Sequence, residues 1–274
     1  MRVTRRAALK GVLVTGVGAL TGAVTYGFGY ERHRIDLTHE SLSVSGLPAP
    51  LDGLRIAFIT DVHHSALVPT EDVVRSVELA SVARPDLVVL GGDYVTFGDR
   101  AFVGPVAELL GPLRAPNGVF AILGNHDDDR DMPAALAHRG FTVLRDQRTT
   151  ITIRGERLDI AGIRFWTRRP SEIARVLRGA GETVLLLAHD PRRLVEAAAF
   201  DVGAVLSGHT HGGQIVLPYV GALATRKFPL AAGLATKNNT SIFVSRGIGT
   251  VYVPVRINCP PEVAIVTLRR KSDI

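Results

Sequence analysis

The feature that most restricts how this chain can fold is a repeated pattern in which a short apolar run ends in residues able to bind a metal ion. An Asp after a strand is commonly a turn or helix-capping residue, and His209 and His211 alone would fit a solvated polar loop. Open α/β sheets, however, place ligand-binding residues beyond the carboxyl ends of their strands, so several such ends together predict one shared site. The five run ends are Asp61-Val62-His63-His64, Gly92-Asp93-Tyr94, Gly124-Asn125-His126-Asp127, His189-Asp190 and Gly208-His209-Thr210-His211.

Apolar runs alternate with helical patterns along most of the chain. Strands are expected over 54–60, 86–92, 118–124, 183–189 and 202–208, and helices over 70–83, 101–113, 132–139, 171–179 and 191–199. Residues 141–166 predict antiparallel strands with turns near Asp146 and Gly155, a first strand is expected within 34–44, and short strands are expected in the last sixty residues. This order favours an α/β fold with four αββα layers, in which two mixed β-sheets pack together and helices flank them.

The N-terminal thirty residues differ in composition from the rest of the chain. Arg2, Arg5, Arg6 and Lys10 precede an uncharged stretch over 11–30, which is about the length that crosses a bilayer. The segment around Arg5-Arg6 is similar to a twin-arginine export signal. We therefore expect a signal or membrane anchor over 1–30, a tether over 31–50 and the main domain over 51–270.

The expected localisation follows from this segment. It is extracytoplasmic, with the protein either membrane-anchored through its N-terminus or exported by the twin-arginine machinery. Two alternatives remain open at this stage: the segment is a buried glycine-rich helix of the domain, or it is removed by cleavage after export.

The cysteine count and the charge limit the chemistry of the site. The single cysteine, Cys259, excludes an internal disulfide and a cysteine-based zinc site, so His, Asp, Glu or Asn must hold any metal ion. Six of the nine histidines lie in the five run ends. Mixed imidazole and carboxylate ligands suit Mn, Fe or Zn better than Ca or Mg. Two divalent cations are expected, with Asp93 as the bridging carboxylate, because it follows a glycine pair that permits close backbone approach.

The net charge of +6 favours an anionic partner, and the positive charge that two cations would leave at the centre favours a phosphoester. Nucleic acid is not the expected partner, since the chain has no long Lys/Arg block with interleaved aromatic residues.

In order and spacing, Asp61-x-His63, Gly92-Asp93, Gly124-Asn125-His126-Asp127, His189 and Gly208-His209-x-His211 resemble the calcineurin-like metallophosphoesterases. The resemblance implies an αββα sandwich and a metal-bridging hydroxide that attacks phosphorus. It also implies that His126 is the catalytic histidine, which protonates the leaving oxygen or steadies the transition state. One cation would be bound by Asp61, His63, Asp93 and His211, and the other by Asp93, Asn125, His189 and His209.

The C-terminal segments 244–250 and 254–268 are similar to the membrane-associated or exported branch of that family, which includes YkuE-like and YaeI-like phosphoesterases and the chlamydial-type UDP-2,3-diacylglucosamine hydrolase. This likeness implies hydrolysis of a phosphomonoester, phosphodiester or pyrophosphate bond in a lipid-linked or cell-envelope substrate. Tyr94-Val95 is not followed by the Asp and Arg that protein phosphatases of the superfamily carry, which makes that activity a poor match.

Four further residues receive provisional roles. His64 and Arg246 are candidates for substrate contact, with a packed loop histidine and a structural salt bridge as the respective alternatives. Asp127 or Asp99 is expected to orient His126. The alternative functions are a nuclease or nucleotidase of the same superfamily, and a metal-binding scaffold without catalysis.

Overall fold

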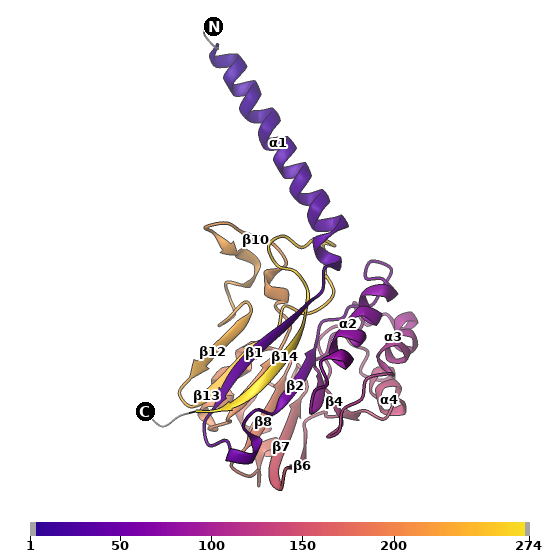
Figure 1. Ribbon diagram of the computed structural model, residues 1–274, viewed down its shortest axis with the longest axis vertical. Coiled ribbons are helices and arrows are strands. Elements are labelled where there is room, and N and C mark those ends of the chain that lie inside the picture. The colour runs from indigo at the N-terminus through magenta and orange to yellow at the C-terminus, as the bar shows by residue number, and fades with distance from the viewer. Residues whose placement is uncertain (1–3, 272–274) are drawn as a thin grey trace.

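The computed structural model describes residues 4–271 and contains two six-stranded sheets that pack face to face (Figure 1). The first sheet has the strand order β1-β14-β2-β3-β4-β5, and the second has the order β12-β13-β9-β8-β7-β6. The first consists of β1 (Asp36–Val44), β14 (Glu262–Arg270), β2 (Arg55–Ile59), β3 (Leu87–Leu90), β4 (Val119–Ala121) and β5 (Thr142–Val143). The second consists of β12 (Gly233–Lys237), β13 (Thr240–Val244), β9 (Ala204–Ser207), β8 (Val184–Ala188), β7 (Glu156–Ile163) and β6 (Gln147–Ile153).

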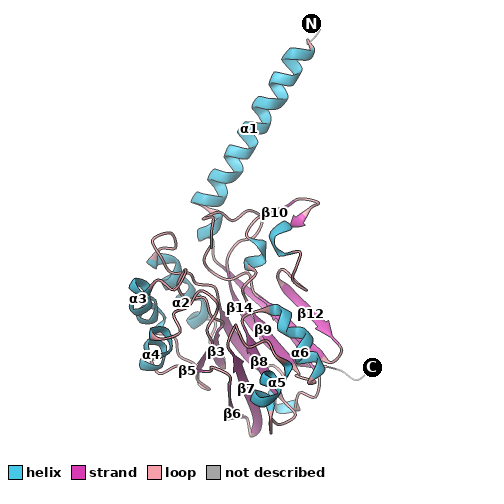
Figure 2. Cartoon of the chain, turned by 180° about the vertical axis from the view of Figure 1, so that it is seen from behind, coloured by secondary structure: helices cyan, strands magenta, loops and turns pink. Residues whose placement is uncertain are grey.

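Helices cover the outer faces of both sheets, as Figure 2 shows from behind. The first sheet is covered by α2 (Thr70–Val82), α3 (Val103–Leu110) and α4 (Asp131–His138), and the second by α5 (Pro170–Leu177) and α6 (Leu194–Ala199). A small hairpin of β10 (Val216–Leu217) and β11 (Gly221–Ala222) lies apart from both sheets. The expected four-layer αββα arrangement is therefore confirmed.

Alternation along the strands explains why there are three apolar layers. In β2, Ala57 and Ile59 pack toward the helices, whereas Ile56 and Phe58 pack toward the second sheet. The inner layer joins both sheets, and Phe58 meets Phe243 of β13 edge-on with ring centroids 6.2 Å apart. Because the central strands are buried on both faces, they are nearly continuous apolar runs in the sequence.

Both sheets are mixed, and the strands that precede the candidate site, β2, β3, β4, β8 and β9, lie in their parallel parts. In the first sheet β2, β3, β4 and β5 are parallel, and in the second β13, β9, β8 and β7 are parallel. Residues 141–166 depart from the expected run of antiparallel strands. Only β6 and β7 form a hairpin, which turns at Gly155, while β5 joins the first sheet.

The N-terminal segment forms α1 (Arg5–Gly29), which projects from the two sheets (Figure 1). Its last turn is fixed to the domain, where the backbone N–H of Arg256 donates to the carbonyl of Gly27 at 3.2 Å. Residues 36–44 of the expected tether form β1, which pairs in parallel with β14. The folded sheet therefore begins before residue 51.

The expected extracytoplasmic localisation, by a membrane anchor or a twin-arginine signal, is contradicted. Within residues 4–271, no helix combines the length and the apolar character needed to span a bilayer. Length alone does not decide this, because α1 has 25 residues, and its glycines and threonines keep its hydropathy low.

Candidate metal centre

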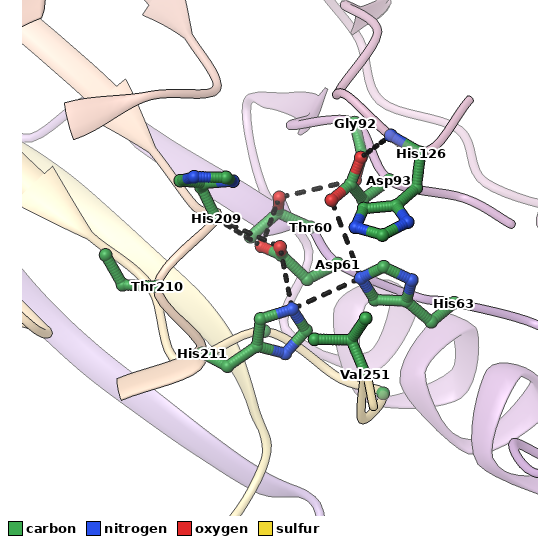
Figure 3. A network of polar contacts seen from close by, with 12 residues as sticks. Thr60, Asp61, His63, Gly92, Asp93, His126, His209, Thr210, His211 and Val251 are labelled. Carbon is green, nitrogen blue, oxygen red and sulfur yellow. Dashed lines mark hydrogen bonds and ion pairs between the residues drawn. The ribbon is translucent and has the colours of Figure 1, made fainter. Parts of the chain in front are cut away.

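Five strand ends bring the candidate ligands together where the two sheets meet. Asp61 and His63 follow β2, Asp93 follows β3, and His126 follows β4, all from the first sheet. His189 follows β8, and His209 and His211 follow β9 in the second sheet. Figure 3 shows side chains from both sheets turned toward one another. The predicted convergence at the carboxyl ends of the strands is therefore present.

The first cluster consists of Asp61, His63 and His211, whose potential ligand atoms lie within 4.8 Å of one another. Nε2 of His63 lies 3.2 Å from Nε2 of His211, and Nε2 of His211 lies 3.3 Å from Oδ1 of Asp61. All three residues are buried. Two imidazoles and one carboxylate that converge in this way could hold a divalent cation.

The second cluster consists of Asp93, His189 and His209. Nε2 of His189 lies 3.1 Å from Oδ2 of Asp93. Nδ1 of His189 donates to the carbonyl of Gly91 at 2.7 Å, which leaves Nε2 free to bind a cation. Oδ1 of Asn125 is buried and has no hydrogen-bond partner among the described residues. An unpaired buried oxygen at this place fits the role of a cation ligand.

Asp93 lies between the two clusters. Its Oδ2 is 3.1 Å from Nε2 of His189 in the second cluster and 3.5 Å from Nε2 of His63 in the first. Its Oδ1 accepts the backbone N–H of His126 at 2.8 Å, which fixes the direction of the carboxylate. This position is the one that a carboxylate shared by two cations requires.

The backbone at the site is strained. Asp61, His63, Asp93, His209 and His211 all have positive φ angles, between 49° and 72°. This left-handed region is unfavourable for residues other than glycine, and such strain gathers where a function requires a particular side-chain direction. Here it turns side chains at the ends of β2, β3 and β9 into the same space.

Burial and neighbouring charges set the protonation of the clusters. Burial lowers the pKa of His63 to about 4 and that of His209 to about 3, so both rings are neutral at pH 7. Burial raises the pKa of Asp61 to about 6. Burial also acts to raise the pKa of Asp93, but the nearby histidines, His189 first, outweigh it and hold that pKa well below its usual value. Neutral imidazoles beside carboxylates fit Mn, Fe or Zn.

Cation binding at pH 7 should release about one proton per chain. Burial acts to lower the pKa of His189, but Asp93 and Asp61 raise it to about 10, so the metal-free ring is charged at pH 7. Because the ring must be neutral to bind a cation, apparent affinity should rise as the pH increases from 6.5 to 8.

Calorimetric titration with Mn²⁺ in two buffers of different protonation enthalpy measures this release. His189→Gln should abolish it, and His138→Gln on the exposed end of α4 should preserve it. Equal heats in both buffers for the unaltered chain would contradict the expectation.

Two residues, the half-buried Asp127 and the buried Arg256, hold the ligand loops, a role that the sequence did not predict for either of them. The Asp127 carboxylate accepts the backbone N–H groups of Asp93, Tyr94 and Gly124 at 2.7–2.8 Å, and so joins the loops after β3 and β4. The Arg256 side chain is fully buried and donates to several backbone carbonyls, including Gly249, whose own N–H donates to the carbonyl of Asp61. The Gly-Asn-His-Asp motif draws attention to Asp127 as a site residue, but no nearby sequence pattern indicates a role for Arg256.

His126 lies at the edge of the centre, with its ring centroid 5.0 Å from that of His63. Its Nδ1 accepts the backbone N–H of Phe97 at 3.2 Å, so the neutral ring carries its proton on Nε2. The expectation that Asp127 or Asp99 orients this ring is wrong. Asp127 accepts backbone N–H groups of the ligand loops, and Asp99 accepts the N–H of Ala101.

The two candidate substrate contacts lie in packed positions. Nδ1 of His64 is 3.0 Å from the carbonyl oxygen of Val68, and its ring packs edge-on against Phe102. The Arg246 guanidinium pairs with Glu262 at 2.9 Å. These contacts favour the alternatives of a packed loop histidine and a structural salt bridge.

Gly208 is required by a close approach. A Cβ at this position would overlap Oδ2 of Asp61 and Oγ1 of Thr60. Gly208→Ala should therefore displace the Asp61 carboxylate and weaken cation binding by about 10–100-fold. Metal titration followed by elemental analysis measures the loss. Gly104→Ala is the matched control, because a Cβ there has no neighbouring atom within 4 Å. Unchanged affinity in Gly208→Ala would contradict the Asp61 assignment.

The two clusters between stacked sheets, together with the family that the chain matches, identify a metal-dependent phosphoesterase. The family model for Calcineurin-like phosphoesterase matches residues 54–213, and the chain belongs to that family. Family membership and the two clusters together indicate a centre for two divalent cations.

Several known proteins resemble the chain along most of its length. Uncharacterized metallophosphoesterase YkuE of Bacillus subtilis is 31% identical, with 98% of each chain covered. Phosphodiesterase YaeI of Escherichia coli is 30% identical, covering 91% of this chain and 96% of its own. The solved structure of Haemophilus influenzae NAD nucleotidase (NadN) has a TM-score of 0.50 at 17% identity, covering 71% of this chain and 50% of its own, and this likeness concerns the fold.

Proposed function

We propose that this chain hydrolyses phosphodiesters at a centre in which Asp93 bridges two divalent cations. The observation that carries the proposal is the position of Asp93, whose Oδ2 lies within 3.5 Å of an imidazole nitrogen in each cluster. The proposed ligands of one cation are Asp61, His63, Asp93 and His211, and those of the other are Asp93, Asn125, His189 and His209. When bound, such cations supply a nucleophile derived from water and neutralise charge on the phosphate.

The chain's own residues would position the substrate and stabilise charge. In our proposal, His126 keeps its proton at Nε2, because Nδ1 accepts the Phe97 N–H. Burial lowers the pKa of His126 below its ordinary value, which favours the neutral ring at pH 7. His126 would therefore donate a hydrogen bond to a phosphate oxygen as negative charge develops there.

A diester is favoured over a monoester by the arginines around the site. A phosphomonoester carries a second negative charge, which proteins commonly bind with a free guanidinium. Arg246 is paired with Glu262, and the Arg256 guanidinium donates to carbonyls of Arg246, Gly247, Gly249 and Cys259. Neither offers that group to a substrate. The name of YaeI, a phosphodiesterase, agrees with this preference.

The proposed substrate is a lipid-linked phosphodiester. An apolar pocket of about 460 Å³ adjoins His209 and His211 and supports this class. A nuclease or nucleotidase would need hydrogen-bonding groups for a base and sugar at the same place.

The test uses protein that is reconstituted with Mn²⁺ and has verified metal content, assayed on bis-4-nitrophenyl phosphate and 4-nitrophenyl phosphate. We expect metal-dependent turnover of both with a higher kcat/KM for the diester. A preference for the monoester would overturn the diester assignment. No turnover above the metal-free protein would overturn hydrolysis and leave a metal-binding scaffold.

A further inference from the structure

The pocket beside the metal centre is open to solvent on one side and is lined by two neighbouring segments and a third that lies further along the chain. It is lined by the metal-site residues His209 and His211 and by residues within 210–217, 224–228 and 251–253. Tyr252 of this lining lies 6.2 Å from the ring of His126 and 5.7 Å from that of Phe97. The pocket therefore adjoins both the second-sheet ligands and the catalytic histidine, and Figure 3 shows Val251 of its wall near His211.

Three polar side chains in the walls, Thr210, Gln214 and Thr225, are engaged by the protein itself. Nε2 of Gln214 donates to the carbonyl of Val253, and its Oε1 accepts the N–H of Val251. The hydroxyls of Thr210 and Thr225 donate to the carbonyls of Ala231 and Ala222. These three side chains are therefore committed to backbone groups, and the other polar groups of the walls are the Tyr252 hydroxyl and the exposed Lys227 ammonium, which lies 5.4 Å from the centre of the Phe228 ring.

Most of the remaining lining is apolar. Ile215, Leu217, Val251, Val253 and Phe228 supply hydrocarbon or aromatic surface. Leu217 is 40% exposed and Val253 is 48% exposed, although both are large apolar side chains. Exposed apolar surface at a hollow of about 460 Å³ is typical of a site that a ligand covers.

We infer that this pocket binds an alkyl or acyl chain carried by the phosphodiester substrate and so selects the substrate. The inference rests on the proposed function, because His209 and His211 both line the pocket and belong to the metal clusters, so a phosphate at the cations would direct its alkyl chain along the apolar walls. Each methylene that leaves water for the pocket strengthens binding, so specificity increases with chain length until the pocket is filled.

The experiment compares 4-nitrophenyl methyl, butyl and octyl phosphates at concentrations below micelle formation, with the Mn²⁺-loaded protein. We expect kcat/KM to rise about threefold per methylene, and by at least about 100-fold from methyl to octyl. Thymidine 5′-(4-nitrophenyl phosphate) should react no faster than the methyl ester. Faster reaction of the thymidine ester than of the octyl ester would overturn the inference.

Binding without turnover is measured by calorimetry with octylphosphonate and methylphosphonate, and octylphosphonate should bind at least about 100-fold more tightly. If octylphosphonate binds more tightly while no ester is hydrolysed, the inference about the pocket is supported and the proposed hydrolysis is overturned. If the three esters react with equal kcat/KM and the two phosphonates bind equally, the pocket inference fails and hydrolysis stands.

Matched variants locate the effect. Leu217→Asn and Val253→Asn place an amide in the pocket wall at half-exposed positions and should reduce the octyl-to-methyl ratio of kcat/KM at least about tenfold. Val220→Asn is the control, because Val220 is 50% exposed and follows β10 but does not line the pocket. It should leave the ratio unchanged. An equal loss in all three variants would contradict the assignment.

Discussion

Asp93→Ala is expected to lower the content of bound divalent cations from two per chain to none. The carboxylate is buried and lies between His189 and His63, so its removal takes a ligand from both cation sites at once. Several kcal/mol of charge stabilisation disappear with the cations, which corresponds to a loss of at least about 10³-fold in kcat/KM for bis-4-nitrophenyl phosphate. Elemental analysis of the reconstituted protein measures the first effect, and steady-state kinetics measure the second.

Two further variants distinguish the loss of cations from misfolding of the protein. Asp93→Asn keeps an oxygen that can accept the His126 N–H and should fold as the unaltered chain does, while still losing cations. Asp129→Ala makes the same truncation at an acidic side chain that is 57% exposed, and should retain both cations. Two bound cations in a folded Asp93→Ala protein would show that Asp93 is not the bridge.

His126→Ala should keep both cations and lower kcat by about 10²–10³-fold, which is the usual cost of removing one hydrogen-bond donor to developing negative charge. The ring contacts the cluster from its edge, and its Nδ1 is engaged by Phe97. The measurements are metal content, and kcat for diesters whose leaving groups range from 4-nitrophenol to an aliphatic alcohol.

The leaving-group series separates the two roles that the resemblance allowed for His126. A hydrogen-bond donor to a phosphate oxygen predicts a similar loss for good and poor leaving groups. Proton transfer to the leaving oxygen predicts a loss concentrated on poor leaving groups, and that result would overturn our assignment. His138→Ala, at an exposed end of α4, is the matched control and should change neither metal content nor kcat.

The layers of the fold and the types of metal ligand could be predicted from the sequence because both depend on short stretches of residues. A strand buried on both faces is a short apolar run, as in 87–90, and the residues that follow it carry their own donor atoms. Metal chemistry then follows from donor type, since a chain with one cysteine must use oxygen and imidazole nitrogen.

The N-terminal segment shows where local pattern was misleading. Its charge-free length suggested an anchor or export signal, but none of the helices described for this chain is long and apolar enough to span a membrane. The length of the segment and its flanking arginines can be read directly from the sequence. Whether a helix spans a membrane depends instead on the summed free energy of transferring every residue into the bilayer, including glycines and threonines.

Sequence alone thus determined which residues have the chemistry of a metal centre and that they follow strands, because side-chain type and strand period are local properties. The family resemblance already implied that His63 and His211 share a cation, but only the tertiary structure decided their 3.2 Å approach across 148 residues and the orientation of His126 by Phe97. It also decided the burial of Arg256 among backbone carbonyls and the position of residues 251–253 against 209–228 to line an apolar pocket. These contacts depend on how whole elements pack, which no short stretch of sequence encodes.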